Sequence, residues 1–300
     1  MAYTTGQLIE SWDYNRIAWG GNTATYTNSI NNLAYIWGAG SGTSGYGQSV
    51  SAITPVATTN TVTAAQWSGL ILAVNGAIGH QSGAGNLLAG GGNIGVIAGA
   101  TIVPFANVVT AINTITTNKA LYSAQGATTT GSVFSPNPTA SSNAQYAGYV
   151  AERTVTFASG DAARYFFNAG GQLNFVVTSV TNNNGLARST GVASALALSS
   201  SGFAATAYNN LTTSYVQRLS VAGSGAYSAD SAQLNVKSSA QNASGNGDKG
   251  AVITFGTYLG SAARNIWNGT LNVTYNHRID IVYPETTYLT SSPWGTPTVA

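Results

Sequence analysis

The sequence contains no cysteine, and only 6% of its 300 residues are Asp, Glu, Lys or Arg. The absence of cysteine excludes a disulfide framework, a thiol nucleophile and a cysteine-ligated metal. An average soluble domain carries about 25% charged residues, so small neutral polar side chains must cover most of this surface. The formal net charge is +2 and the basic residues are scattered singly, whereas nucleic-acid binding needs clustered Lys and Arg. We therefore expect no nucleic-acid partner.

Charge is missing from a long stretch of the N-terminal half. After Arg16, no Asp, Glu, Lys or Arg occurs until Lys119, and Gly, Ser, Thr, Asn and Ala fill the gap. The cores of protein interfaces are poor in charge and rich in aromatic residues. We therefore expect the aromatic residues of this stretch to make assembly contacts with other chains. They are Trp19, Tyr26, Tyr35, Trp37, Tyr46, Trp67 and Phe105.

Signals for secretion and membrane insertion are also missing. Residues 1–16 have neither the basic region nor the apolar run of a secretion signal, so we expect the protein to be made and kept in a cytoplasm. The uncharged stretch 87–109 contains Asn93, Asn107, Pro104 and several glycines, which makes it a poor membrane span. We expect no membrane association.

In the first half of the chain, apolar residues recur with the period of a helix. Residues 27–37 form the first predicted helix. Thr63 and Gln66 form a capping box at the start of the second, which runs to about Gly79. Residues 104–119 form the third, with a proline in its first turn and a lysine at its end.

In the second half, apolar and polar residues alternate as in β-strands. One short helix is expected at residues 160–171, between the first two strands. The predicted strands are 153–158, 172–180, 214–223, 232–240, 251–259 and 270–283.

The segment 122–144 has the Ser, Thr, Pro and Gly content of a linker. We therefore predict an α+β protein with a helical, charge-poor docking domain at 1–121 and a mainly antiparallel β-sandwich domain at 145–300. The linker would connect two independent cores.

Two stretches match the pattern G-x-G-x-x-G, at residues 40–45 and 90–95. Neither follows a convincing strand in a βαβ unit, and the Lys and Ser/Thr pair of a phosphate-binding loop is missing. Such matches arise by chance in a chain with 36 glycines. We expect turns or close chain crossings at these stretches, and no bound nucleotide.

The two histidines fall in different predicted domains, so they cannot form a metal cluster within one domain. His80 lies near the end of the second predicted helix, where it suits the helix dipole. His277 follows the pattern of an exposed strand residue beside Arg278. Glu10 and Asp13 are the closest pair of carboxylates in the sequence, but no apolar or basic residues are arranged around them for acid/base catalysis. We predict no enzyme activity, and no catalytic, cofactor-binding or metal-binding residue.

Three segments, residues 63–83, 162–175 and 269–296, resemble virion structural proteins of tailed bacteriophages, particularly phages of cyanobacteria. The resemblance touches both predicted domains. It implies a place in the virion, with other virion proteins as partners, and it carries no catalytic or cofactor residue.

From the composition and this resemblance we expect an appendage or fibre-like component that docks through its N-terminal domain and turns its β-sandwich outward. We expect a homo-oligomer, and the resemblance favours a trimer because fibre-like phage components are commonly threefold. One alternative is a carbohydrate-binding module for host adhesion, which would use Tyr and Trp stacking. A hydrolase of envelope polysaccharide is the other, and the lack of a clustered acidic pair counts against it.

Overall fold

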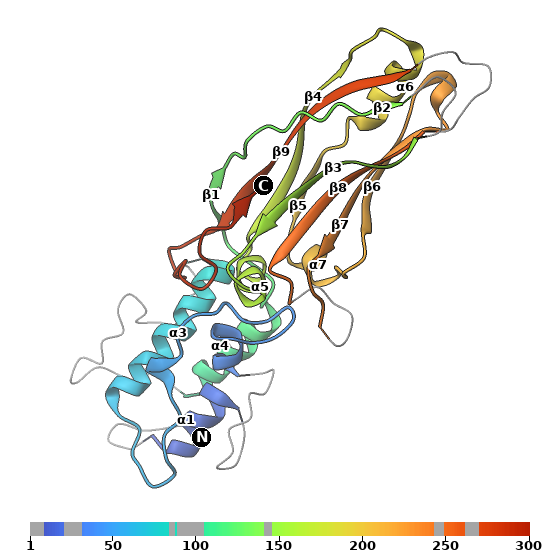
Figure 1. Cartoon of the computed structure of the whole chain (residues 1–300). Coiled ribbons are helices and arrows are strands. Elements are labelled where there is room, and N and C mark those ends of the chain that lie inside the picture. Colours follow the sequence, from blue (N-terminus) through green and yellow to red (C-terminus); the bar gives the residue numbers. More distant parts are fainter. Residues whose placement is uncertain are drawn as a thin grey trace. The chain divides into compact units, whose positions relative to one another are not determined.

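The computed structural model divides the chain into two compact units. It describes residues 9–20, 32–83, 88, 105–140, 146–242, 249–261 and 270–300. The first of the two units, here called the helical unit, comprises Met1–Ala127, Arg164–Gly171 and Pro284–Gly295. The second, called the sandwich unit, comprises Thr128–Ala163, Gln172–Tyr283 and Thr296–Ala300. The predicted α+β class is confirmed, since helices dominate the N-terminal half and two antiparallel sheets form the C-terminal part (Figure 1).

The helical unit is built around one long helix, α3 (Figure 1). As predicted, Thr63 caps α3, and the Thr63 and Gln66 side chains make the reciprocal bonds of a capping box. The helix continues past Gly79 and ends before Gly83. Because α3 is apolar on nearly all sides, other elements surround it. The elements of this unit are α1 (Ser11–Trp19), α2 (Leu33–Trp37), η1 (Ser51–Ile53), α3 (Ala64–Ser82) and α4 (Phe105–Thr117).

The other helix predictions hold in part. The helix predicted at 27–37 is described only from Leu33 to Trp37, since residues 27–31 lie outside the described chain. The helix predicted at 104–119 is α4, and Pro104 also lies outside the described residues. The sequence pattern does not predict α1, because Asn15 and other polar residues occupy its buried side. The Asn15 amide donates to the Val56 carbonyl at 2.7 Å and accepts from the Val56 N–H at 2.9 Å.

The sandwich unit contains two five-stranded antiparallel sheets. The first has the order β1-β9-β4-β5, with β2 also paired to β9, and the second has the order β10-β3-β8-β7-β6. The strands are β1 (Gln125–Thr129), β2 (Thr139–Ala140), β3 (Tyr146–Thr156), β4 (Gln172–Asn182), β5 (Ser200–Phe203), β6 (Val216–Ala222), β7 (Ser231–Ser238), β8 (Val252–Ser261), β9 (Leu271–Pro284) and β10 (Thr298–Val299).

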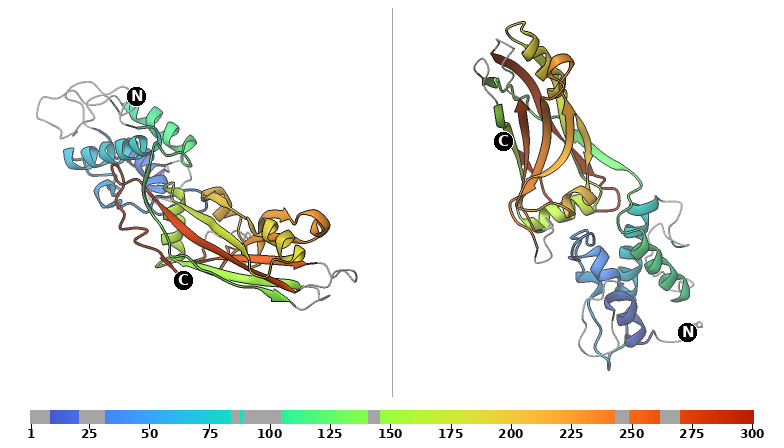
Figure 2. Two further views of the ribbon diagram at one scale, coloured as in Figure 1. Left: turned by 90° about the horizontal axis from the view of Figure 1, so that it is seen from above. Right: turned by 90° about the vertical axis from the view of Figure 1, so that its right-hand side faces the viewer.

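Aromatic rings from both sheets meet in the core of the sandwich. The ring centroid of Phe255 in the second sheet lies 6.4 Å from that of Phe175 and 5.4 Å from that of Phe203, which both belong to the first sheet. Short helices α6 (Ala187–Leu196) and α7 (Ala205–Asn209) and the turn η3 (Gly225–Tyr227) complete the unit, and α5 (Gly160–Asn168) contains the division between units. Helix α6 packs against β4, β6 and β7, and so covers an open side of the core (Figure 2).

The segment predicted as the linker 122–144 is largely an edge of the first sheet. Phe134 and His277 exchange two backbone hydrogen bonds of 2.8 and 3.0 Å, and the carbonyl of Pro136 accepts from the Tyr275 N–H at 3.2 Å. Proline lacks an N–H and is tolerated on a sheet edge, where only its carbonyl must pair. A segment rich in Ser, Thr, Pro and Gly can therefore form the edge of a sheet as well as a linker, and its composition does not distinguish the two.

The division into units also differs from the predicted boundaries. Residues Arg164–Gly171 and Pro284–Gly295 lie within the predicted β-sandwich domain but belong to the helical unit by their contacts. Each unit is thus assembled from three separate segments, which a single boundary in the sequence cannot describe.

Candidate functional site

Four of the seven predicted assembly residues lie in the core of the helical unit. Tyr35, Tyr46, Trp67 and Phe105 are buried within the chain itself. The Tyr46 hydroxyl donates to the Lys119 carbonyl at 3.1 Å and accepts from the Gln81 amide at 2.8 Å. A ring that its own chain covers has no surface left for another chain. These four residues therefore serve internal packing. Their burial corrects the prediction that they contact other chains.

The other predicted assembly residues keep some exposure or lie outside the described chain. Trp19 and Trp37 are half-buried. Their indole N–H groups donate to backbone carbonyls of the same unit, Trp19 to Ile53 and Trp37 to Ser49. Tyr26 lies outside the described residues. Both tryptophans thus have an internal structural role as well as a remaining surface.

The glycine-rich stretch 40–45 is held by two side chains of α5, all within the helical unit. Arg164 donates to the Ser44 carbonyl at 2.8 Å. The Asn168 amide nitrogen lies 3.0 to 3.3 Å from the carbonyl oxygens of Gly42, Ser44 and Gly45. Phosphate-binding loops present N–H groups to their ligand, whereas this loop presents carbonyls to α5. The stretch 90–95 lies outside the described residues.

His80 forms a buried pair with a carboxylate from the distant end of the sequence. Its Nδ1 lies 3.2 Å from Oε1 of Glu285, and the His80 side chain is fully buried. The ring of Tyr46 contacts His80 edge-on at 5.0 Å. His80 lies in the last turn of α3, as expected, and it has in addition a specific partner that ties Pro284–Gly295 to this helix.

His277 is buried, and the expectation of an exposed pair with Arg278 is wrong. Neighbouring residues of a strand point to opposite faces, so His277 enters the core while Arg278 points outward and bonds Asp280 at 2.9 Å. The rings of Phe175 and Tyr275 lie 5.0 and 4.7 Å from the imidazole.

Neither ring nitrogen of His277 has a hydrogen-bond partner in the structure. Burial lowers its pKa to about 4, and the positive charge of Arg153 acts in the same direction. His277 is therefore a neutral core residue at neutral pH. A side chain sealed in this way cannot reach a ligand in solvent.

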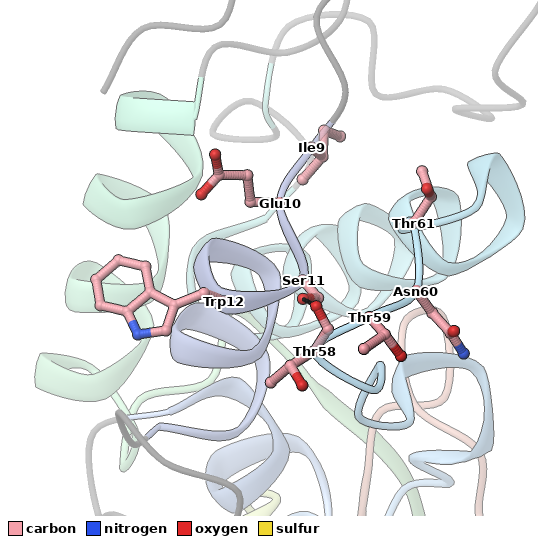
Figure 3. A pocket seen from close by; sticks show the side chains of 8 residues that line it. All are labelled: Ile9, Glu10, Ser11, Trp12, Thr58, Thr59, Asn60 and Thr61. Carbon is pink, nitrogen blue, oxygen red and sulfur yellow. Dashed lines mark hydrogen bonds between the residues drawn. The ribbon is translucent and has the colours of Figure 1, made fainter.

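A shallow pocket of about 320 Å³ opens on the helical unit beside the start of α1 (Figure 3). Glu10 and Trp12 lie on one side of it and Thr59, Asn60 and Thr61 on the other (Figure 3). Asp13 is the carboxylate closest to Glu10 in the sequence, but it does not line the pocket and is buried. Among the described residues that line it, the pocket therefore presents one carboxylate and several hydroxyls, and no pair of carboxylates.

The outer face of the second sheet carries three clustered tyrosines, here called the tyrosine cluster: Tyr149, Tyr215 and Tyr258. The rings of Tyr149 and Tyr215 are stacked with centroids 4.3 Å apart, and Tyr258 meets Tyr149 edge-on at 5.5 Å. Tyr149 is 38% exposed. Strand β8 explains this arrangement, because Phe255 and Leu259 enter the core and Tyr258 therefore points outward.

Polar and charged groups border the tyrosine cluster. The Tyr215 hydroxyl donates to Glu152, and the ammonium nitrogen of Lys237 lies 4.3 Å from the Tyr215 ring centroid. The buried amide of Asn235 donates to the Tyr149 hydroxyl at 3.3 Å. Burial, and then the hydrogen bond and negative charge of Glu152, raise the pKa of Tyr215, so its hydroxyl stays protonated as a donor.

Gly256 makes room for two of these rings. A Cβ at Gly256 would lie 2.8 Å from atoms of the Tyr149 ring and 3.0 Å from an atom of the Tyr215 ring. The rings therefore rest on the sheet at a place where a larger residue would force them to shift. Local sequence patterns do not predict this cluster, although a glycine inside a strand pattern is a signal that another group approaches the strand closely.

Across the described residues, no group of three or more His, Cys, Asp or Glu side chains is placed to hold a metal ion. None of the helices in that part of the chain is long and apolar enough to cross a membrane. No protein-family model, curated protein or solved structure matches this sequence.

Proposed function

We propose that this chain is a non-catalytic structural component of a tailed phage particle, of the appendage or fibre-like kind. In this proposal the helical unit docks on other virion proteins and the sandwich unit faces outward. Its partners are other virion proteins and further copies of the same chain, with a trimer as the favoured state. The resemblance of the sequence to phage structural proteins supports a location in the phage particle. The surface of α4 supports docking through the helical unit.

The exposed side of α4 is the observation that carries this proposal. Thr110, Asn113, Thr114 and Thr117 are exposed, and no charged residue occurs in the helix. The threonine hydroxyls bond the carbonyls four residues earlier in the same helix, at 2.9 to 3.0 Å. Covering this surface would remove no charge from water, and its threonine hydroxyls would keep their hydrogen bonds. Both features lower the cost of desolvation in an interface.

The structure also indicates which helix should be altered to test docking. Helix α3 offers little exposed surface, since most of its side chains are buried. The test therefore uses Thr114→Lys on α4. The matched control is Ser194→Lys on α6, where an exposed hydroxyl also bonds the carbonyl four residues earlier. Light scattering at tens of micromolar should show a homo-oligomer for the native chain and for the control, and smaller species for the α4 variant.

A monomeric native chain would contradict the homo-oligomer. Docking on other virion proteins has a separate test, which is localisation of the chain on intact particles by cryo-electron microscopy. We expect the helical unit to touch the particle body. An outward helical unit would overturn the proposed orientation.

A second candidate function is carbohydrate binding for adhesion to the host. The tyrosine cluster favours it, because exposed aromatic rings bordered by hydrogen-bonding groups are suited to sugars. The two functions are compatible, since one uses the helical unit and the other the sandwich unit.

A further inference from the structure

We propose that the tyrosine cluster, together with Glu152, is a binding site for neutral hexopyranose chains. This inference rests on the second candidate function above and names its site and its ligand class. Three features of the site support this ligand class: the aromatic surface, the balance of charge and the rigidity of the rings.

Three neighbouring tyrosine rings form an aromatic surface on the outer face of this sheet. Tyr149 is 38% exposed although it stacks on Tyr215, and Tyr258 extends the same surface. The C–H groups of a pyranose ring pack on aromatic carbons, while its hydroxyls need hydrogen-bonding partners nearby. Tyrosine supplies both, since each ring is apolar and ends in a hydroxyl.

The balance of charge points to a neutral ligand. Glu152 and Lys237 contribute one charge of each sign, and both engage the same ring, Tyr215. An anionic chain would meet the Glu152 carboxylate, and a cationic chain would meet the Lys237 ammonium. A chain of uncharged sugars would meet neither repulsion, and its hydroxyls can donate to the carboxylate, which is a strong acceptor.

The rings are held in place before any ligand binds. Asn235 beneath the cluster is only 6% exposed and donates to the Tyr149 hydroxyl. Gly256 receives the Tyr149 and Tyr215 rings on the sheet surface. Side chains that are already ordered lose little conformational entropy on binding, which favours affinity.

A purely structural role is the competing explanation, in which the rings only cover the gap at Gly256. That role accounts for Tyr149 and Tyr215, which touch the position of the missing Cβ. It gives no part to the Glu152 carboxylate in binding. The two explanations therefore predict different effects for a change at Glu152 that leaves the rings in place.

The test measures binding of maltohexaose, cellohexaose and mannohexaose to the full-length protein by titration calorimetry and ligand-observed NMR. Hexagalacturonate serves as the anionic comparison. We expect millimolar or tighter binding of at least one neutral hexaose and weaker binding of the anionic one. Tyr149→Ala should weaken binding about tenfold or more, and Glu152→Gln several-fold, because a charged acceptor forms the stronger hydrogen bond.

The matched control is Trp12→Ala, since Trp12 is also 38% exposed but belongs to the helical unit. It should leave sugar binding unchanged. Tyr149→Phe keeps the ring but loses the hydrogen bond from Asn235, so it should weaken binding less than Tyr149→Ala does, which separates the contribution of the ring from that of its hydroxyl. Circular dichroism checks that each variant is folded.

The outcomes are distinguishable. Absence of binding to every neutral hexaose at millimolar concentration would overturn the carbohydrate function and this site with it. Binding that survives both Tyr149→Ala and Glu152→Gln would leave the function standing and overturn the site. Equal or tighter binding of hexagalacturonate would overturn the neutral ligand class alone.

Discussion

His80 and Glu285 are 205 residues apart in the sequence, and their side chains meet in the interior of the helical unit with Nδ1 and Oε1 3.2 Å apart. The second carboxylate oxygen of Glu285 accepts from the Thr287 N–H at 2.6 Å. Nearby, the Gln48 side chain donates to the Thr290 carbonyl at 3.1 Å and accepts from its N–H at 2.9 Å. Residues Pro284–Gly295 are thus fastened to the helical unit by side chains as well as by packing.

Replacing Glu285 by alanine should destabilise the helical unit by about 1–3 kcal/mol, because buried hydrogen-bonding groups of His80 and Thr287 lose their partner. Chemical unfolding followed by helical circular dichroism measures the change. Asn113→Ala on α4 is the control, since that side chain is exposed and its loss should change stability by less than about 0.5 kcal/mol. Equal losses of unfolding free energy in the two variants would show that the buried pair does not stabilise the helical unit.

Acid should weaken the sandwich through His277. Burial, and then Arg153, lower its pKa from 6.5 to about 4, so the unfolded chain takes up a proton more readily than the folded one. Its contribution is complete above about pH 6.5 and is lost as the pH falls toward about 4. The loss amounts to about 3 kcal/mol by linkage.

The measurement is the free energy of unfolding at pH 7 and at pH 4.5, for the native chain and for His277→Phe. Phenylalanine suits the ring neighbours Phe175 and Tyr275, and it cannot titrate. We expect the variant to lose less stability than the native chain between these two pH values. Identical pH dependence in both proteins would contradict the assignment of this acid sensitivity to His277. Glu285 loses stabilising energy in acid as well, because burial raises its pKa but hydrogen bonds from His80 and Thr287 hold the pKa below the ordinary 4.5. Both proteins contain Glu285, so its contribution cancels in the comparison.

Gly69→Ala should destabilise the helical unit although alanine favours helices by about 1 kcal/mol over glycine. A Cβ at this position of α3 would lie 2.5 Å from the Ala52 carbonyl oxygen of η1, and backbone cannot turn aside as a side chain can. The net loss should be about 1–3 kcal/mol in a thermal or chemical unfolding experiment. Gly148→Ala is the control, because nothing lies within 4 Å of its added Cβ. A stabilised Gly69 variant would show that α3 and η1 can move apart freely.

Asn168→Ala should destabilise the helical unit by about 1–3 kcal/mol, since it removes the donor that faces the carbonyls of Gly42, Ser44 and Gly45. Asn113→Ala on the exposed side of α4 is the matched control. Unfolding by denaturant compares the two. A loss no larger than that of the control would mean that the glycine-rich loop keeps its shape without α5.

Signals between near neighbours in the chain were readable from the sequence. Thr63 and Gln66 are three residues apart, and their capping box marks the start of α3 because both partners lie in one turn. Alternation along β9 likewise predicts a strand with one buried face. The same alternation could have placed His277 inward with Tyr275, because the two are separated by one residue and share a face.

Features that depend on contacts between residues far apart in the sequence were decided only by the tertiary structure. The edge segment around Phe134 pairs with β9, far along the chain, so its prolines gave only the composition of a linker. The tyrosine cluster gathers side chains from three separate parts of the sequence, and only the strand order of the second sheet brings them together. The aromatic residues of the charge-free stretch suited an interface and a core equally well, since both exclude water. Whether Tyr46 is buried by its own chain depends on the surrounding packing, which no local pattern of residues specifies.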